Sequence, residues 1–201
     1  MQQFFYKYRL FSARLLLSFL GVLGIFTQPL IYNTPYYPIA LILGLTLIVI
    51  GIIGRIFSIL FISAGKDKNL ATTGIYSISR NPLYFFSFIA MVGVTVIYSS
   101  IFIAIFFILG FMIYYYFVIA YEENKLLDIF GENYQKYLNS STPKFIPNFS
   151  LWRAQNYYHI YYKDVVKMIF DAMWFFIIGI AVFTILSLQS VGIIPVFFYI
   201  L

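Results

Sequence analysis

The sequence predicts an all-α membrane protein: one domain over residues 1–201, folded as a bundle of about five transmembrane helices. Hydrophobic residues make up 62% of the chain and charged residues only 10%, which leaves too little polar surface to cover a soluble globule. Apolar stretches of about 20 residues recur, and each is long enough to cross a bilayer. Basic residues lie beside alternate connections between these stretches, as in multi-pass membrane proteins.

The predicted spans are apolar on every side rather than along one stripe, which is typical of helices in lipid. They cover residues 15–31, 39–62, 83–98, 101–120 and 172–201. Three basic residues precede the first span as in a signal peptide, but no small-x-small cleavage site follows, so we expect a retained helix. Residues 188–201 contain Pro195, and the sequence leaves open whether they cross, fold back or lie in the interface.

Charge placement predicts the orientation of the bundle. With five spans, all thirteen Lys and Arg residues fall at the N-terminus, in two connections or at the span ends beside them, on one side of the membrane. Connections 28–38 and 98–100 and the C-terminal tail carry no charge. The positive-inside rule therefore places the N-terminus in the cytoplasm and the C-terminus outside. An active site built from the polar loops would face the cytoplasm.

Composition excludes several kinds of chemistry. The chain has no cysteine, so disulfides and thiolate nucleophiles are excluded, and the single histidine, His159, cannot form a metal site alone. No nucleophilic triad and no Rossmann or P-loop spacing is present. The net charge of +6 is scattered along one membrane face, which fits anionic lipid headgroups at least as well as nucleic acid. We expect membrane lipids as partners, no nucleic acid and no metal; the oligomeric state stays open.

Two polar features lie in or beside the second and third spans. Arg55 sits within the second span, where it would either snorkel to the membrane surface or line a cavity. Residues 74–84, GIYSISRNPLY, follow a polar loop, and Pro82 suits the first turn of the third span. A helix N-terminus preceded by Arg80 favours an anion. The alternative is a plain helix start capped by Asn81, with Arg80 on a headgroup phosphate.

A third polar feature ends the fourth span, where Glu122 and Glu123 are adjacent. Successive helical residues diverge by about 100°, so at most one of them points straight into the bundle. The alternative is that both are ordinary solvated charges. An amphipathic segment follows and ends at 141–147, STPKFIP, which contains Lys144.

The order of these motifs resembles a family of integral membrane methyltransferases that includes isoprenylcysteine carboxyl methyltransferase and the phospholipid N-methyltransferases. The signature covers residues 55–147: a membrane arginine, G-x-Y-x-x-x-R-N-P-x-Y, Glu-Glu, F-G-x-x-Y-x-x-Y and a basic-F-I-P stop. The resemblance implies a cytoplasm-facing pocket for S-adenosylmethionine and a lipid acceptor that enters between spans.

By position, the resemblance implies cofactor-binding roles for the loop, the polar turn and the paired glutamates: Gly74, Tyr76, Arg80, Asn81, Pro82, Tyr84, Glu122 and Glu123. The catalytic candidates are Glu123, which with Glu122 could deprotonate an amine acceptor, and Arg55 and Lys144, which could orient an anionic substrate group. Methyl transfer is an in-line displacement that depends mainly on alignment, so no covalent nucleophile is needed.

The expected acceptor is a lipid or a prenylated small molecule or protein. The pattern at 122–147 is most similar to the isoprenylcysteine branch, so carboxyl O-methylation is the first choice and N-methylation of a phospholipid or other amphiphile is the alternative. Asn81 stands where many members have histidine, Phe86 where glycine is common, and Ser141 where arginine is common. These departures keep open a non-catalytic scaffold or lipid-binding protein with the same fold. The apolar spans argue against a transporter.

Overall fold

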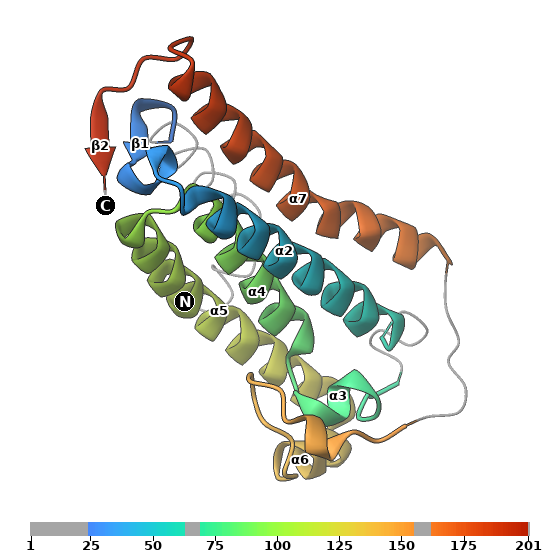
Figure 1. Ribbon diagram of the computed structural model, residues 1–201. Helices are drawn as coiled ribbons and strands as arrows, with labels where there is room; N and C mark the ends of the chain where they lie inside the picture. The colour runs from blue at the N-terminus through green and yellow to red at the C-terminus, as the bar shows by residue number, and fades with distance from the viewer. Residues whose placement is uncertain (1–23, 63–68, 155–161, 201) are drawn as a thin grey trace.

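The computed structural model describes residues 24–62, 69–154 and 162–200, which form an elongated helical bundle (Figure 1). Two very short strands and two 3-10 turns accompany the helices. In chain order the elements are β1 (Thr27–Pro29), η1 (Leu30–Asn33), α2 (Tyr37–Leu60), α3 (Ile75–Ile78), α4 (Pro82–Tyr98), α5 (Ile101–Phe130), α6 (Glu132–Leu138), η2 (Phe149–Leu151), α7 (Tyr162–Ser190) and β2 (Phe198–Ile200).

Three helices in the described part are long and apolar enough to cross a membrane: α2, α5 and residues Ile169–Ser190 of α7. Helix α4 is equally apolar but spans only 17 residues. The mostly helical fold is as predicted. Most of the predicted first span lies outside the described residues, so five spans and a cytoplasmic N-terminus remain predictions.

Three predicted boundaries were wrong. Helix α5 continues past residue 120 to Phe130, and α7 begins at Tyr162 rather than at residue 172. The predicted first span extended to residue 31, yet Thr27–Pro29 form β1, which pairs in parallel with β2. The C-terminal stretch therefore folds back beside the start of the described chain after α7 ends at Ser190 (Figure 1).

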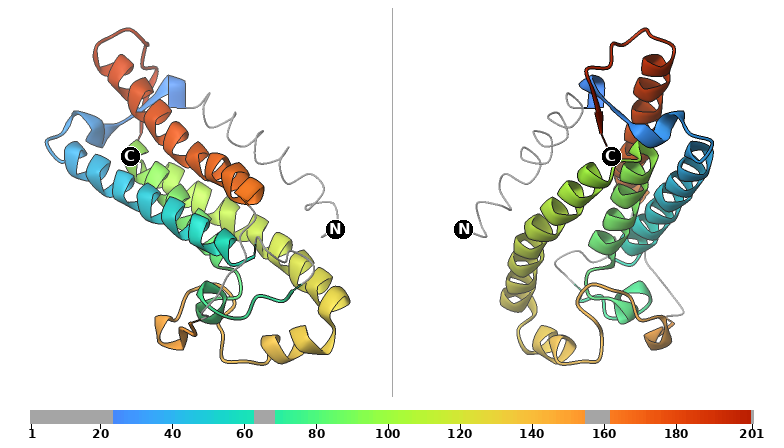
Figure 2. Two further views of the ribbon diagram at one scale, coloured as in Figure 1. Left: turned by 90° about the vertical axis from the view of Figure 1, so that its right-hand side faces the viewer. Right: turned by 60° about the vertical axis from the view of Figure 1, so that its left-hand side comes forward.

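Helix α4 is the centre of the bundle, because α2, α5 and α7 all contact it (Figure 2). Its contact with α2 is made through small residues. A Cβ at Gly51 would lie 2.6 Å from the Cβ of Ala90, and one at Gly44 would lie 2.7 Å from the carbonyl oxygen of Gly93. Side chains this small let two helix backbones approach closely, which is how membrane helices commonly associate.

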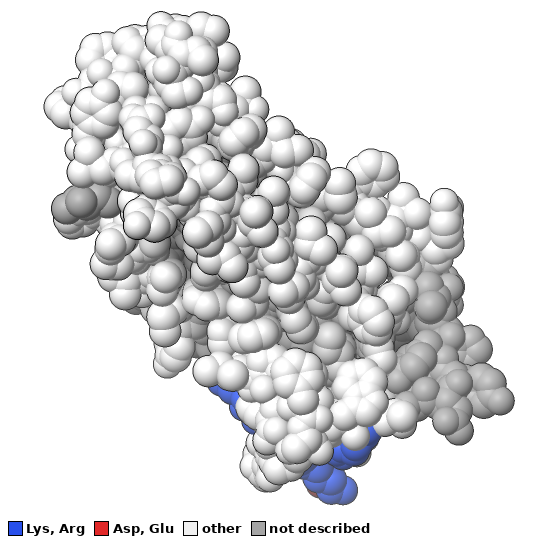
Figure 3. Space-filling model, in the orientation of Figure 1, with Lys and Arg blue, Asp and Glu red and all other residues white. Residues whose placement is uncertain are grey.

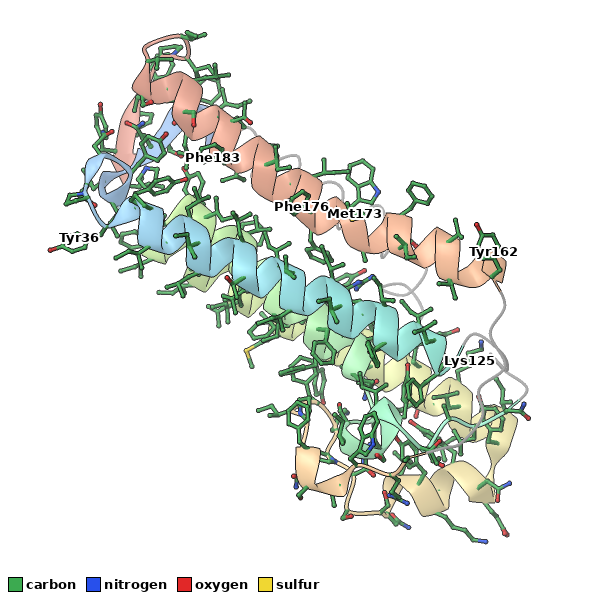
Figure 4. The ribbon with its side chains drawn as sticks, turned by 45° about the vertical axis from the view of Figure 1, so that its right-hand side comes forward. Tyr36, Lys125, Tyr162, Met173, Phe176 and Phe183 are labelled. Atoms are coloured by element: carbon green, nitrogen blue, oxygen red, sulfur yellow. The ribbon has the colours of Figure 1, made fainter. Side chains whose placement is uncertain are left out.

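The two ends of the bundle differ in chemistry. Near β1, Gln189 donates hydrogen bonds to the carbonyl oxygens of Ile25 and Thr27 at 2.9 and 3.3 Å, and this joins the end of α7 to β1. At the opposite end lie α3, α6 and η2, where nitrogen and oxygen atoms gather and Lys125 is found (Figure 4). Among the described residues on the face shown in Figure 3, Lys and Arg lie only at that second end. We call it the polar end.

Candidate active site

The polar turn, residues 78–81, leads into α4 and is held by a strap of residues 138–148. The side chain of Asn81 makes no capping hydrogen bond, so the plain Asn-capped start is not observed. Side-chain and backbone donors bind carbonyl oxygens across the two segments instead: Arg80 N to Pro143 O (2.8 Å), Asn81 Nδ2 to Lys144 O (3.0 Å), Ser79 Oγ to Phe145 O (2.9 Å) and Asn148 N to Ile78 O (2.8 Å).

Glu123 joins two cations at this end. Its Oε1 lies 3.4 Å from Nε of Arg80, and its Oε2 lies 3.1 Å from Nζ of Lys144. The side chains of Arg80 and Glu123 are each 14% exposed, whereas that of Lys144 is 43% exposed. Nη1 of Arg80 also donates to the carbonyl oxygens of Leu138 (3.1 Å) and Thr142 (3.3 Å). The cluster thus links the start of α4, the end of α5 and the strap.

Three tyrosines form the wall beside this cluster. The hydroxyl of Tyr137 donates to the carbonyl oxygen of Tyr76, and both Tyr134 and Tyr137 are buried. Burial raises the pKa of Tyr76 well above its ordinary value, and the negative charge of Glu122 adds to the effect. Burial likewise raises the pKa of Tyr134 and Tyr137. All three phenols therefore stay neutral at physiological pH. The negative charges of Glu123 and Glu122 both add to the raised pKa of Tyr134, so both carboxylates lie near the tyrosine wall.

Gly74 fixes where α3 begins. Its φ of +57° is favoured by glycine, and its N–H donates to the carbonyl oxygen of Arg153 at 2.7 Å. A Cβ at this position would collide with the ring of Phe61 at the end of α2. Gly74 therefore helps to position the polar turn by packing closely against the ring of Phe61.

Pro82 and Tyr84 occupy the first turn of α4. Pro82 is buried at the N-terminus of the helix, as predicted for a proline at this position. The ring of Tyr84 lies 4.9 Å from that of Tyr115 on α5, centre to centre. The ring of Phe86 fills the space left by Gly54 on α2, so this departure from the family pattern is accommodated between α2 and α4.

Arg55 lies apart from Glu123 and Lys144. Its Nη1 donates to Oγ of Ser87 on α4, and its guanidinium carbon lies 5.4 Å from the centre of the Phe175 ring on α7. The side chain is thus turned into the bundle and held there by contacts with two neighbouring helices, which argues against snorkelling. The three catalytic candidates form two groups: Glu123 with Lys144 at the polar end, and Arg55 deeper between the helices.

Sequence reasoning missed several neighbours of these residues. Ser87 and Phe175 contact Arg55, and Nζ of Lys144 lies 5.9 Å from the centre of the Tyr116 ring. None of the three stands out in a sequence so rich in aromatic residues. Tyr137 could be found, because it closes the F-G-x-x-Y-x-x-Y pattern.

The polar end carries the carboxylates of Glu122 and Glu123 and the cations of Arg80 and Lys144 beside neutral tyrosines. It therefore suits a ligand that carries charges of both signs.

The comparison with protein families gives this arrangement its context: residues 39–133 match the profile of the phospholipid methyltransferases. Residues 39–133, slightly less than half of the chain, are thus similar to this family. The match confirms the resemblance found in the sequence. The matched region contains α2 through α5 with the polar turn and Glu123, whereas Lys144 and α7 lie beyond it.

Two curated relatives carry other names. The chain is 33% identical to the nickel-cobalt-cadmium resistance protein NccN of Alcaligenes xylosoxydans xylosoxydans over 135 residues, 67% of this chain and 62% of that protein. It is 27% identical to the cobalt-zinc-cadmium resistance protein CzcN of Cupriavidus metallidurans over 182 residues, 90% of this chain and 83% of that protein. The first alignment thus spans less than two thirds of NccN. No solved structure matches the chain.

Proposed function

We propose that the chain is an integral membrane methyltransferase that uses S-adenosylmethionine to methylate a lipid or lipid-like acceptor. The family match supports methyl transfer, and three apolar helices support a membrane location. The observation that carries the proposal is the ion-paired cluster of Arg80, Glu123 and Lys144 at the polar end, three residues for which the resemblance implies roles in binding cofactor or substrate. Charge placement in the sequence supports a site that faces the cytoplasm.

The residues at the polar end fit the charged groups of the cofactor. Nε of Arg80 and Oε1 of Glu123 are both buried and form an ion pair at 3.4 Å, but neither atom makes a hydrogen bond within the described chain. Arg80 could bind the cofactor's carboxylate, and Glu122 or Glu123 its ammonium or ribose hydroxyls. The faces of Tyr76 and Tyr84 suit a sulfonium.

Gly74, Asn81 and Pro82 would act by positioning. Gly74 packs against Phe61, the Asn81 side chain binds the strap, and Pro82 opens α4. An asparagine that donates a structural hydrogen bond does not have to titrate, so the absence of histidine at position 81 is compatible with catalysis that needs no proton transfer there.

When bound, the cofactor supplies a methyl carbon whose bond to sulfur breaks, leaving the electron pair on sulfur, as the acceptor's lone pair forms the new bond. The protein's part is to align the acceptor and exclude water. A carboxylate acceptor is already ionised at neutral pH. An amine acceptor must give up a proton, and Glu122 or Glu123 at the polar end would be the base that takes it.

We place isoprenylcysteine-type carboxyl O-methylation first among acceptors, on the likeness of residues 122–147 to that branch. N-methylation of a phospholipid or other amphiphile is the second candidate, favoured by the name of the matching family. Assays with a prenylcysteine analogue and with phosphatidylethanolamine distinguish them. Amine methylation should also weaken as pH falls and the amine is protonated, whereas carboxylate methylation should hold steady through neutral pH.

The deciding experiment is equilibrium binding of S-adenosylmethionine and its demethylated product to the detergent-purified protein. We expect saturable binding that Glu123→Gln weakens at least about tenfold, because a charge-assisted contact is lost. Asp128→Asn removes an exposed carboxylate from the same helix and should bind as the wild type does. A folded wild type that binds neither compound would overturn the proposal and favour the non-catalytic scaffold.

The names of the relatives suggest a physiological setting. We propose that methyl transfer by this chain supports resistance to nickel, cobalt, zinc or cadmium, the metals named in NccN and CzcN. Expression in a metal-sensitive bacterial host should raise the tolerated metal concentration, and Glu123→Gln should abolish the gain. Equal metal resistance from the wild type and Glu123→Gln would show that resistance does not depend on methyl transfer.

A further inference from the structure

The strap and the 3-10 turn η2 that follows it expose three large apolar side chains at the polar end. Ile146 is 71% exposed, Phe149 is 70% exposed and Trp152 is 48% exposed. Residues three apart lie on the same face of a 3-10 turn, so Phe149 and Trp152 share one side of η2. Exposed apolar side chains gathered in this way mark a surface that meets lipid or another protein.

The strap lies alongside the apolar helices rather than clear of them. The ring of Phe145 lies 5.7 Å from that of Phe85 and 6.2 Å from that of Phe88, both on α4. Phe88 is six residues beyond Pro82, about 9 Å along α4 at ~1.5 Å per residue. Phe145 therefore holds the strap against the side of α4, at a level between one and two turns into that helix.

The edges of the patch adjoin two helices that are able to span a membrane. Nζ of Lys144 lies 5.9 Å from the centre of the Tyr116 ring, an exposed side chain on α5. At the other edge, the ring of Trp152 lies 6.3 Å from that of Phe61, the residue that follows the end of α2. The patch thus lies where a membrane interface is expected, and tryptophan is enriched at such interfaces.

The charges around the patch match an anionic membrane surface. Residues 138–153 contain Lys144 and Arg153 and no acidic residue. Arg153 is exposed, and its backbone is fixed to α3, because its N–H donates to Oγ of Ser77 and its carbonyl oxygen accepts from Gly74. Basic residues beside exposed aromatic side chains are typical of segments that lie in a bilayer interface. Charge and position therefore both favour lipid over a protein partner.

We propose that the strap and residues 149–153 form an interfacial anchor in the leaflet at the polar end. The three apolar side chains insert among the lipids, and Arg153 contacts their phosphate groups. The strap also carries the carbonyl oxygens that hold Arg80 and Asn81. Seating of the anchor in a bilayer therefore keeps the polar turn in position to bind a ligand. This coupling to the site rests on the proposed function, whereas the anchoring does not.

Tryptophan fluorescence of the full chain in lipid nanodiscs tests the anchor. The chain has two tryptophans, so Trp174→Phe leaves Trp152 as the reporter. We expect lipids brominated in the upper part of their chains to quench Trp152, and iodide in the water to quench it little. Trp152→Phe is the positive control, because Trp174 is exposed on the apolar part of α7 and should be quenched by bromine. Quenching of Trp152 by iodide but not by bromine would overturn the anchor and favour a protein partner.

Phe149→Ser in the Trp174→Phe background tests the patch itself. Trp152 should lose most of its bromine quenching, because a large apolar group no longer draws η2 into the leaflet. Tyr36→Ser is the matched control: it removes an equally exposed aromatic ring at the opposite end of the bundle and should leave the quenching unchanged. Equal quenching in the Phe149→Ser and Tyr36→Ser proteins would overturn the role of the patch.

Arg153→Gln, in the same background, tests the contact with phosphate groups. Bromine quenching of Trp152 should rise when phosphatidylglycerol is added to phosphatidylcholine discs, and Arg153→Gln should remove that rise. A rise of the same size in both proteins would overturn the contact.

A second reporter decides the question should Trp174→Phe fail to fold by size-exclusion chromatography and circular dichroism. The chain has no cysteine, so Phe149→Cys can carry a single polarity-sensitive dye. Emission typical of lipid supports the anchor, and emission typical of water overturns it.

Binding of S-adenosylmethionine in the same discs separates the coupling from the anchoring. Phe149→Ser should weaken the affinity about two- to tenfold, the value of one hydrogen bond of the strap, and Tyr36→Ser should not change it. Equal affinity in the wild type and Phe149→Ser would overturn the coupling. A protein whose Trp152 is quenched by bromine but that binds no S-adenosylmethionine would refute the methyltransferase proposal and support the anchor.

Discussion

Gly74 illustrates how one residue without a side chain sets the geometry of the polar end. Two glycines have nearly the same strained backbone, Gly74 with φ +57° and Gly131 with φ +51°, but only Gly74 faces a neighbour, the ring of Phe61. We expect Gly131→Ala to lower the free energy of unfolding by about 1–2 kcal/mol through backbone strain alone. Gly74→Ala should cost about 2–5 kcal/mol, because overpacking adds to that strain.

Thermal and denaturant unfolding in detergent measures this difference. Binding of S-adenosylmethionine should fall in Gly74→Ala even below its melting temperature, since α3 would shift. Equal destabilisation by the two substitutions would show that the contact with Phe61 does not constrain α3.

The buried tyrosines of α6 predict a loss of stability in alkali. Burial raises the pKa of Tyr134 and Tyr137 above the ordinary value of 10.0. The folded state keeps these protons where the unfolded chain releases them, so the stabilisation is complete below about pH 10 and is lost as pH rises further. Tyr137→Phe should reduce the slope of unfolding free energy against pH by up to about 1.4 kcal/mol per pH unit.

Unfolding measured at intervals from pH 8 to about pH 11 tests this expectation, with Tyr162→Phe as the control because Tyr162 is 78% exposed. Tyr137→Phe should also be slightly less stable at pH 8, because the carbonyl oxygen of Tyr76 loses its donor. Identical slopes of unfolding free energy against pH in the wild type, Tyr137→Phe and Tyr162→Phe would show that folding does not raise the pKa of Tyr137.

At the residue scale, the sequence could indicate which side chains gather but not what holds them. Charge placement predicts that Arg80, Glu123 and Lys144 lie on one side of the membrane, their order places them in one signature, and the structure brings all three together. The partners of Asn81 and Ser79 are backbone carbonyl oxygens of the strap. Every residue has such an acceptor, so no sequence pattern reveals which one is used.

At the scale of elements, the small-residue contact between α2 and α4 should determine whether the bundle closes. A Cβ at Gly51 would lie 2.7 Å from the backbone nitrogen of Ala90, whereas one at Gly110 on α5 would meet nothing within 4 Å. Gly51→Ala should therefore lower the free energy of unfolding by about 1–3 kcal/mol by forcing the helices apart. Gly110→Ala should be neutral or slightly stabilising, because alanine is the better helix former.

Thermal melting of the two variants in the same detergent makes the comparison direct. A Gly51→Ala protein as stable as Gly110→Ala would show that α2 and α4 can separate without cost.

The long helices could be predicted from apolar length, but the ends of elements could not. Helix α5 runs ten residues past its apolar stretch through Glu122 and Glu123, because these charges reach the polar end, where they have partners and solvent. Strands β1 and β2 are three residues each, too short for alternation to show inside apolar sequence. Their pairing joins residues far apart in the chain, which local patterns do not record.

For the whole molecule, the number of crossings determines which side each end occupies. Between Tyr36, which is 70% exposed at the end near β1, and exposed Ser150 at the polar end, the chain runs through α2, α4 and α5. Three crossings put these residues on opposite sides. The chain has no cysteine, so single cysteines report accessibility without background.

We expect a membrane-impermeant thiol reagent applied to intact cells to label Tyr36→Cys, and to label Ser150→Cys only after the membrane is opened. Gln3→Cys tests the predicted first span: with five crossings and positive-inside orientation it should behave like Ser150→Cys. Labelling of Gln3→Cys from outside would mean that the N-terminal segment does not cross, leaving four spans. Labelling of Ser150→Cys from outside would place the polar end, with Glu123 and Lys144, away from cytoplasmic S-adenosylmethionine and would contradict the proposed enzyme directly.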